Sequence, residues 1–195
     1  MAYYQRGCVH YCNSDRLAVG DKRSSESSGR ENPDLVQPAE SEIAMSKYKL
    51  SKRSLSKLEG VNEPLVDTVK RAIELTKVDF GVICGLRTEE EQRVLVSKGA
   101  SQTMHSRHLT GNAVDLMAYI DGRGCWELNV YDEIADAMKQ AAMETGAKIR
   151  WGCAWHIDSL ADYSGTMEDA MNLYIDLRRT AKRRPFLDGP HFELR

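Results

Sequence analysis

The sequence predicts an α+β fold in which a small antiparallel sheet is flanked by helices. Short apolar or alternating stretches, typical of strands, stand at 80–84, 113–119, 148–151 and 188–194. Longer segments with apolar residues at helical spacing stand at 62–76, 88–99, 129–145 and 167–182. The two kinds of segment are mixed along a chain of 195 residues, which is enough for one domain with its own core.

Start and stop residues define the helices in the first half of the chain. A short helix over 50–58 ends at Gly60. Asn62 is placed to cap the next helix, with a proline in its first turn. Thr88 is predicted to cap a third helix through a capping box with Glu91. The arginine just before it, Arg87, therefore stands where a strand gives way to a helix.

The second half begins with a strong turn signal at 121–124 and a helix over 129–145 that is closed by a glycine. Residues 152–165 are predicted to be irregular. The helix over 167–182 ends in a basic cluster before Pro185. These cations suit a helix C-terminus, and no aromatic residues interleave them, so they do not indicate a nucleic-acid surface.

The first 44 residues differ from the rest because they are polar and of low complexity, as in the run 24–29. Such a segment buries too little apolar surface to offset its chain entropy, and we expect residues 1–44 to be a disordered extension. Met45 opens the regular sequence and is a candidate alternative translation start. We therefore expect the domain to span 45–195.

Composition excludes several classes of protein. The net charge of −2 gives no argument for nucleic-acid binding, and no apolar run is long enough to cross a bilayer. The N-terminus lacks the pattern of a secretory signal. The five cysteines are odd in number and irregular in spacing, which argues against a disulfide framework and suits a reducing cytoplasm.

Two stretches carry the residues of a candidate metal site. His108 and Asp115 stand seven residues apart with Gly111 between them, and a second stretch near the C-terminus supplies Asp188 and His191. Two imidazoles and a carboxylate form a three-ligand zinc set that leaves a fourth position open, as catalytic zinc sites do. His108, Asp115 and His191 are the predicted ligands.

The remaining residues have roles that suit hydrolysis. Asp188 is free to act as general base, and Arg87 could bind an oxyanion or a substrate carboxylate. Simpler interpretations exist for each. A His-x6-Asp pair also arises by chance, Asp188 suits an ordinary turn, and Arg87 could pair with a glutamate on the helix face. His105 is an alternative to His108 as a ligand.

Four motifs together carry a resemblance to a known family. They are Gly85-Leu86-Arg87-Thr88, Ser106-x-His108-x2-Gly111-x-Ala113-x-Asp115, Trp151-Gly152, and Asp188-x2-His191-Phe192. In this order they resemble the zinc-dependent peptidoglycan peptidases of the D-alanyl-D-alanine carboxypeptidase group, above all the L-alanyl-D-glutamate endopeptidases that serve as bacteriophage endolysins.

The resemblance implies a hedgehog-like α+β domain, Zn²⁺ as cofactor, the three ligands above and Asp188 as catalytic base. It further implies Arg87 as the residue that stabilises the transition state or orients the substrate. It also implies cleavage between L-Ala and D-Glu of the peptidoglycan stem peptide. We expect a monomer that stays in the cytoplasm of the infected host until a separate pore-forming protein releases it. The alternatives are a D,D-carboxypeptidase or dipeptidase that uses the same zinc site, and a non-catalytic zinc-binding module.

Three features depart from the family pattern. Cys153 and Ala154 stand where the family commonly has a glycine and an acidic residue, which bears on substrate fit near Trp155. The stretch 163–184 is longer than a minimal endolysin needs and is predicted to add a helix beside the cleft. The first 44 residues have no counterpart in the family.

Overall fold

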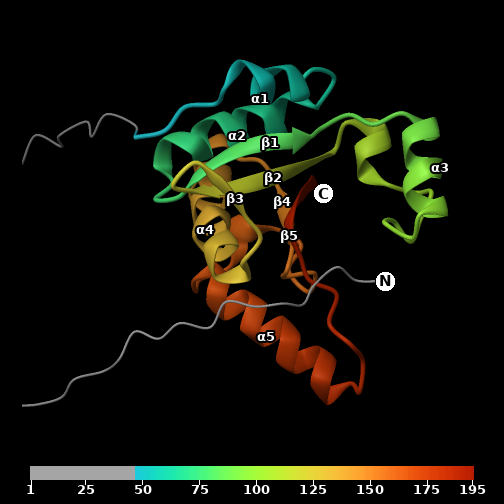
Figure 1. Ribbon diagram of the computed structural model, residues 1–195. Coiled ribbons are helices and arrows are strands. Elements are labelled where there is room, and N and C mark those ends of the chain that lie inside the picture. Colours follow the sequence, from blue (N-terminus) through green and yellow to red (C-terminus); the bar gives the residue numbers. More distant parts are fainter. Residues whose placement is uncertain (1–46) are drawn as a thin grey trace, which may run out of the picture. The chain divides into compact units, whose positions relative to one another are not determined.

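The computed structural model describes residues 47–195, so the expected disorder of 1–44 and the alternative start at Met45 lie outside the described residues. The described part is an antiparallel sheet with helices around it (Figure 1), as the sequence predicts. Its elements are α1 (Lys52–Lys57), α2 (Glu63–Leu75), β1 (Asp79–Cys84), α3 (Glu89–Ser97), the 3-10 turn η1 (Arg107–Thr110), β2 (Ala113–Ile120), β3 (Arg123–Cys125), α4 (Leu128–Thr145), β4 (Ile149–Gly152), the 3-10 turn η2 (Leu160–Asp162), α5 (Met167–Thr180) and β5 (Asp188–Leu194).

The sheet has the strand order β1-β2-β5-β4, with β3 paired to β2 outside this path. Each of these pairings is antiparallel. The last strand of the chain, β5, is therefore inserted between β2 and β4, strands that are already separated by the whole of α4. This crossing of distant segments places the C-terminal stretch beside the His108–Asp115 stretch.

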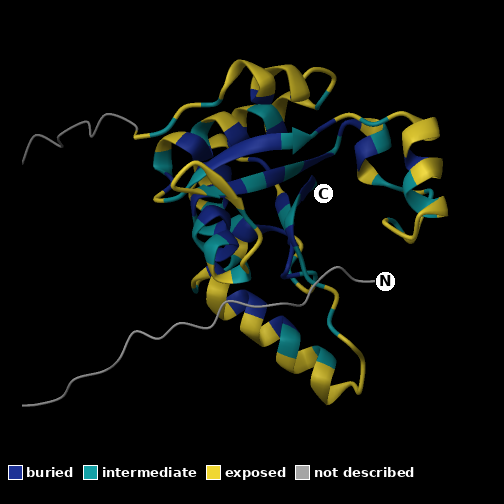
Figure 2. Cartoon of the chain, in the orientation of Figure 1, coloured by how far each residue is buried: buried dark blue, intermediate teal, exposed yellow. Residues whose placement is uncertain are grey.

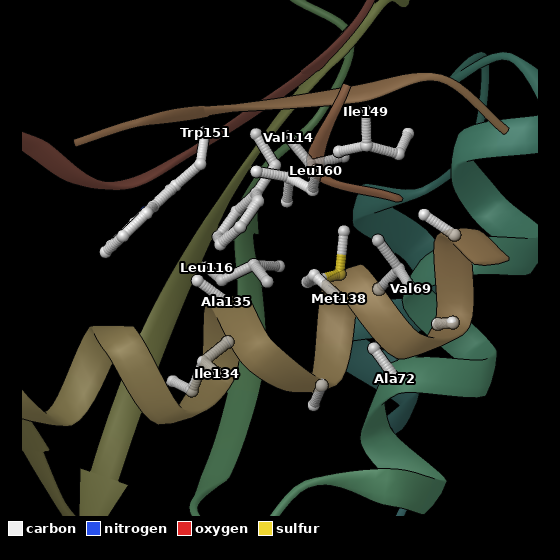
Figure 3. Close-up of a cluster of buried hydrophobic side chains, with 14 of the residues drawn as sticks. Val69, Ala72, Val114, Leu116, Ile134, Ala135, Met138, Ile149, Trp151 and Leu160 are labelled. Atoms are coloured by element: carbon white, nitrogen blue, oxygen red, sulfur yellow. The ribbon is translucent and has the colours of Figure 1, made fainter. Parts of the chain in front are cut away.

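The core lies between the sheet and the pair of helices α2 and α4. Figure 3 shows side chains from α2, α4, β2 and β4 meeting there, and the labelled residues are all fully buried. They are Val69, Ala72, Val114, Leu116, Ile134, Ala135, Met138, Ile149, Trp151 and Leu160. Burial of aliphatic and aromatic side chains of this size stabilises the fold by roughly 1.5–3 kcal/mol each. The core thus holds the strands that carry the candidate site.

The capping predictions are confirmed for α3 and corrected for α2. The Thr88 hydroxyl accepts from the Glu91 amide while the Glu91 carboxylate accepts from the Thr88 amide, as the capping box requires. Asn62 does stand at the N-cap of α2, but its side chain makes no capping hydrogen bond. It donates instead to the Thr110 carbonyl and to the Asn112 side chain. These hydrogen bonds connect the start of α2 to the loop before β2.

Three short elements were not predicted: the 3-10 turn η1 before β2, the strand β3 and the 3-10 turn η2. The turn signal at 121–124 is the tip of a hairpin, in which Asp121 and Gly122 both have positive φ, and β3 returns along β2 from Arg123. Positive φ at both central residues is the geometry of a type I′ hairpin turn. The segment predicted to be irregular contains η2, which packs against α4.

The additional helix predicted within 163–184 is α5. It begins at a second capping box, between Thr166 and Asp169, and its N-terminal half packs on α4. Figure 2 shows that its buried residues lie toward that end, whereas the end nearest Thr180 is exposed. Within residues 47–195, no helix combines the length and the apolar character needed to cross a membrane.

Candidate active site

Three adjacent strands bring the predicted residues together. Asp115 on β2 lies opposite Cys84 on β1, where the β1–β2 register shifts, and opposite His191 on β5. Cross-strand partners project from the same face of a sheet, with Cβ atoms about 5 Å apart. Asp115 therefore stands at the centre of the site, with His191 on one side of it.

His108 reaches the same carboxylate from η1, the turn just before β2. The Ser106 hydroxyl accepts from the His108 amide at the start of this turn, and Gly111 ends it with a φ of +68°. A side chain at Gly111 would also bring a Cβ to 2.4 Å from the Gly60 carbonyl oxygen. The glycine therefore allows a tight turn against the α1–α2 loop that buries His108.

Both imidazoles contact one oxygen of Asp115. His108 Nε2 and His191 Nδ1 each lie 3.2 Å from Asp115 Oδ1. Burial by itself lowers the pKa values of both imidazoles, but the hydrogen bond and charge of Asp115 raise them, to about 10 for His108 and about 9 for His191. Burial opposes ionisation of Asp115, yet the two imidazoles hold its pKa well below the usual range.

The outer ring nitrogens of both histidines are held by acceptors. His108 Nδ1 lies 2.8 Å from the Gly85 carbonyl oxygen and His191 Nε2 lies 3.1 Å from Glu193 Oε2. Because these oxygens can only accept, both outer nitrogens carry the proton. If the inner nitrogens lose their protons, each has a lone pair free on the side of Asp115 while the outer nitrogen still donates to an acceptor. Histidine ligands of metals have this same pattern, with the outer N–H held by an acceptor.

This donor set fits zinc. Two imidazole nitrogens and a carboxylate oxygen are zinc ligands in proteins, and neighbouring ligands of a tetrahedral zinc ion lie about 3.3 Å apart. The separations of 3.2 Å from Asp115 Oδ1 to each histidine nitrogen match that spacing. The structure thus brings the side chains of His108 and His191 to one oxygen of Asp115.

Cys84 is a further neighbour of the site that the sequence analysis did not include. One ligand atom each from Cys84, His108 and Asp115 lies within 4.8 Å of the others, so these three residues could also hold a metal ion. However, Cys84 Sγ lies 3.7 Å from His108 Nδ1, the nitrogen held by the Gly85 carbonyl. It also accepts from Arg87 Nη2 at 3.2 Å. Cys84 Sγ is therefore shared between the outer nitrogen of His108 and the Arg87 guanidinium.

Arg87 lies just after β1 and is fixed by two side chains. Its Nη2 lies 3.5 Å from Asp115 Oδ2, and its Nη1 donates to Gln92 Oε1 at 2.7 Å. Gln92 is fully buried and donates in turn to Ser101 and to the Thr103 carbonyl. Arg87 thus pairs with Asp115 rather than with a glutamate of α3, and its guanidinium is held beside the two histidines.

Asp188 is the first residue of β5 and lies opposite Gly152, where the β4–β5 register shifts. A Cβ at residue 152 would lie 2.3 Å from the Asp188 carbonyl oxygen, so only glycine allows this approach of the two strands. Burial raises the pKa of Asp188, although the nearby charges of His191, His108 and Arg87 oppose this. The carboxylate is therefore within electrostatic reach of the predicted ligands and retains a proton more readily than an exposed aspartate.

Within residues 47–195, the two other histidines, His105 and His156, have no hydrogen bond to Asp115. His105 is exposed in the loop before η1, and it is His108 that contacts Asp115. The His156 ring stacks on Tyr174 with the ring centroids 5.9 Å apart. Of the two candidates in the loop, His108 is therefore the one that the structure places at the site.

Comparison with known proteins identifies the family of this chain. A sequence model of the phage L-alanyl-D-glutamate peptidases matches residues 45–195. The chain belongs to this family. It is 30% identical over 151 residues to the L-alanyl-D-glutamate peptidase of Escherichia phage T5, a match that covers 75% of this chain and 98% of that protein. The crystal structure of the L-Ala D-Glu endopeptidase ChiX of Serratia marcescens is similar with a TM-score of 0.55 and 33% identity, over 76% of this chain and 92% of that one.

Membership of the L-alanyl-D-glutamate peptidase family confirms the predicted group and its α+β fold. The departures at Cys153 and Ala154 are internal in this peptidase, because both residues are fully buried in the core. The roles of Cys84, Gln92, Glu193 and the Gly85 carbonyl as partners of the site residues were not predicted from the sequence. Gln92 stands next to Glu91 of the capping box, and in the structure it is the one buried residue of α3.

Proposed function

We propose that this peptidase is a zinc-dependent endopeptidase that hydrolyses the L-alanyl-D-glutamate bond of the peptidoglycan stem peptide. His108, Asp115 and His191 are the proposed zinc ligands. The observation that carries the proposal is the shared Asp115 oxygen, which both imidazoles contact through their inner nitrogens while their outer nitrogens are held by acceptors. The names of the phage T5 and ChiX relatives, which both specify this bond, supply the substrate.

Zinc bound there would supply a Lewis acid that polarises the scissile carbonyl and makes water a nucleophile at neutral pH. Asp188 is the group that accepts the proton of the attacking water and returns it to the leaving amine. An aspartate with its ordinary pKa of about 3.9 is a poor proton donor at neutral pH. The burial that raises the pKa of Asp188 therefore suits both halves of this task.

Arg87 stabilises the negative charge that develops on the carbonyl oxygen of the scissile bond. Its Nη1 is engaged by Gln92, and its Nη2 lies between Cys84 and Asp115, so the guanidinium is fixed before substrate arrives. A donor that is already oriented needs no reorganisation as charge develops, which is the basis of oxyanion stabilisation. A role in holding a carboxylate of the stem peptide would use the same guanidinium.

The similarity to phage peptidases supports a proposal for the biological setting. We propose an endolysin that acts as a monomer on the host cell wall, after a separate pore-forming protein releases it from the cytoplasm of the infected bacterium. Family membership and the similarity to the phage T5 peptidase over nearly the whole of that protein support this setting.

Mass spectrometry of the products from purified Gram-negative sacculi tests the function. The full-length protein is assayed as prepared, with chelator, with zinc restored, and as Asp188→Ala. We expect new L-Ala C-termini and D-Glu N-termini that require both zinc and Asp188. Release of terminal D-alanine alone would show a D,D-carboxypeptidase instead, and the absence of any product from folded, zinc-loaded protein would refute catalysis on this type of wall.

A further inference from the structure

His191 is held by more than the candidate metal site. Its Nε2–H donates to Glu193 Oε2 at 3.1 Å, and the other carboxylate oxygen, Oε1, accepts from Arg150. The Arg150 Nε lies 3.0 Å from Glu193 Oε1, and a guanidinium Nη2 contacts the same oxygen. Glu193 is 4% exposed, so its charge is compensated inside the protein by these two partners.

The register of the sheet creates this arrangement. His191 and Glu193 are two residues apart on β5 and so project from the same face. Asp115 on β2 lies opposite His191, and Arg150 on β4 lies opposite Glu193. Four polar side chains thus form a continuous path across three strands, in the order Asp115, His191, Glu193, Arg150.

The Trp155 indole contacts two of these four side chains, His191 and Arg150. The Trp155 ring centroid lies 5.7 Å from that of His191, and the Arg150 guanidinium carbon lies 5.0 Å from the Trp155 ring centroid. The Trp155 Nε1–H donates to the Phe186 carbonyl, which fixes the indole. Arg150 is therefore a common partner of Glu193 and Trp155, two of the side chains that contact the His191 ring.

We propose that Glu193, paired with Arg150, is the positioning residue that fixes the tautomer and ring orientation of His191 so that Nδ1 binds the metal. The inference rests on the proposed function, because it requires His191 to be a metal ligand. A carboxylate that accepts from the outer nitrogen of a ligand histidine also makes the inner nitrogen more basic. Glu193 suits this role because one of its oxygens is available to His191 while the other is occupied by Arg150.

Zinc affinity measured by chelator competition tests the proposal, with Glu193→Ala and Glu193→Gln in the full-length protein. Loss of such an outer partner weakens metal binding by roughly 10- to 100-fold, and we expect this for Glu193→Ala. Glu193→Gln should show a smaller loss of zinc affinity than Glu193→Ala, because the amide keeps one acceptor oxygen. It should still lose some affinity, because that one oxygen replaces the two that serve His191 and Arg150. The visible spectrum of the cobalt-substituted protein should change in the same order, because it reports the ligand geometry.

The matched control is Glu144→Ala. Glu144 lies on α4 and is also paired with an arginine, Arg71 on α2. This variant should leave zinc affinity and the cobalt spectrum unchanged. Thermal unfolding of every variant without zinc shows that the protein is folded. If Glu193→Ala does not fold, Glu193→Gln, which keeps the volume of the side chain, decides the question.

Zinc affinity within about twofold of the wild type, with an unchanged cobalt spectrum, in the folded Glu193 variants would overturn the proposal. His191→Ala in the same series separates this result from a failure of the proposed function. If His191→Ala loses zinc while the Glu193 variants keep it, the positioning role is wrong and the metal site stands. If His191→Ala binds zinc like the wild type, His191 is not a ligand and both proposals fall.

Discussion

Replacement of Gly152 by alanine should displace the catalytic base Asp188 while leaving the Asp188 side chain itself unchanged. The added Cβ would lie 2.3 Å from the Asp188 carbonyl oxygen and 2.9 Å from its Cβ. Ordinary van der Waals contact begins at 3.4 Å, so the start of β5 must move by about 1 Å (3.4 minus 2.3). The neighbour is backbone rather than a flexible side chain, and the strand itself therefore has to shift.

A displacement of about 1 Å at a reacting group reduces the rate by roughly 100-fold. We expect kcat on a soluble stem-peptide substrate to fall by about that factor. The overpacking should also reduce the free energy of unfolding by roughly 1–3 kcal/mol, measured by urea denaturation. Bound zinc should stay stoichiometric, because the three atoms nearest to the added Cβ all belong to Asp188.

Gly124→Ala is the control, since this glycine also lies in a strand and has no positive φ. Its added Cβ would meet the Met117 sulfur at 3.3 Å, a flexible side chain that can give way. This variant should keep kcat near the wild-type value. A kcat for folded Gly152→Ala that also stays within about threefold of the wild type would refute the claim that this approach of β4 to β5 places the catalytic base.

The other predictions concern single side chains and protons. Asp188→Asn should lower kcat by roughly 10²- to 10⁴-fold with zinc still bound, as general-base loss requires, and a stoichiometric loss of zinc by elemental analysis would contradict its role as base. Arg87→Ala should lower kcat by roughly 10²- to 10³-fold in steady-state kinetics, and a change confined to KM would instead indicate uniform substrate binding. Zinc-free protein should lose stability as pH rises: the pKa values of His108 and His191 are raised to about 10 and 9, so their stabilisation is complete below about pH 6.5, the unfolded value, and is lost through pH 9–10. Calorimetry should show a falling Tm over that range, whereas zinc affinity should rise as the protons leave, and a pH-independent Tm would count against the shared Asp115 contact.

The elements predicted from the sequence are those with strong local signals. Thr88 and Glu91 form their capping box because the motif needs only residues of one turn. The alternation over 113–119 predicts β2 because Val114 and Leu116 must face the core. Asn62 departs from its predicted capping role because tertiary partners, the Thr110 carbonyl and the Asn112 side chain, compete for its amide.

The partners of the site residues could not be predicted in the same way. Arg150 and Glu193 are 43 residues apart and meet because β4 and β5 pair in one particular register. A shift of one residue would turn one of them to the other face. Cys84 likewise approaches the site only because of the register shift opposite Asp115. Sequence spacing indicates which residues have suitable chemistry, whereas strand register decides which of them touch.

The central claim is that His108, Asp115 and His191 form the metal site. Anomalous diffraction at the zinc absorption edge, from crystals of the zinc-loaded protein, tests it most directly. We expect one peak bonded to His108 Nε2, Asp115 and His191 Nδ1, at the distances of about 2.0–2.2 Å that zinc adopts with nitrogen and oxygen. A peak bonded to Cys84 Sγ, with His191 outside the coordination sphere, would contradict this ligand set and assign the ion to the Cys84, His108 and Asp115 group instead.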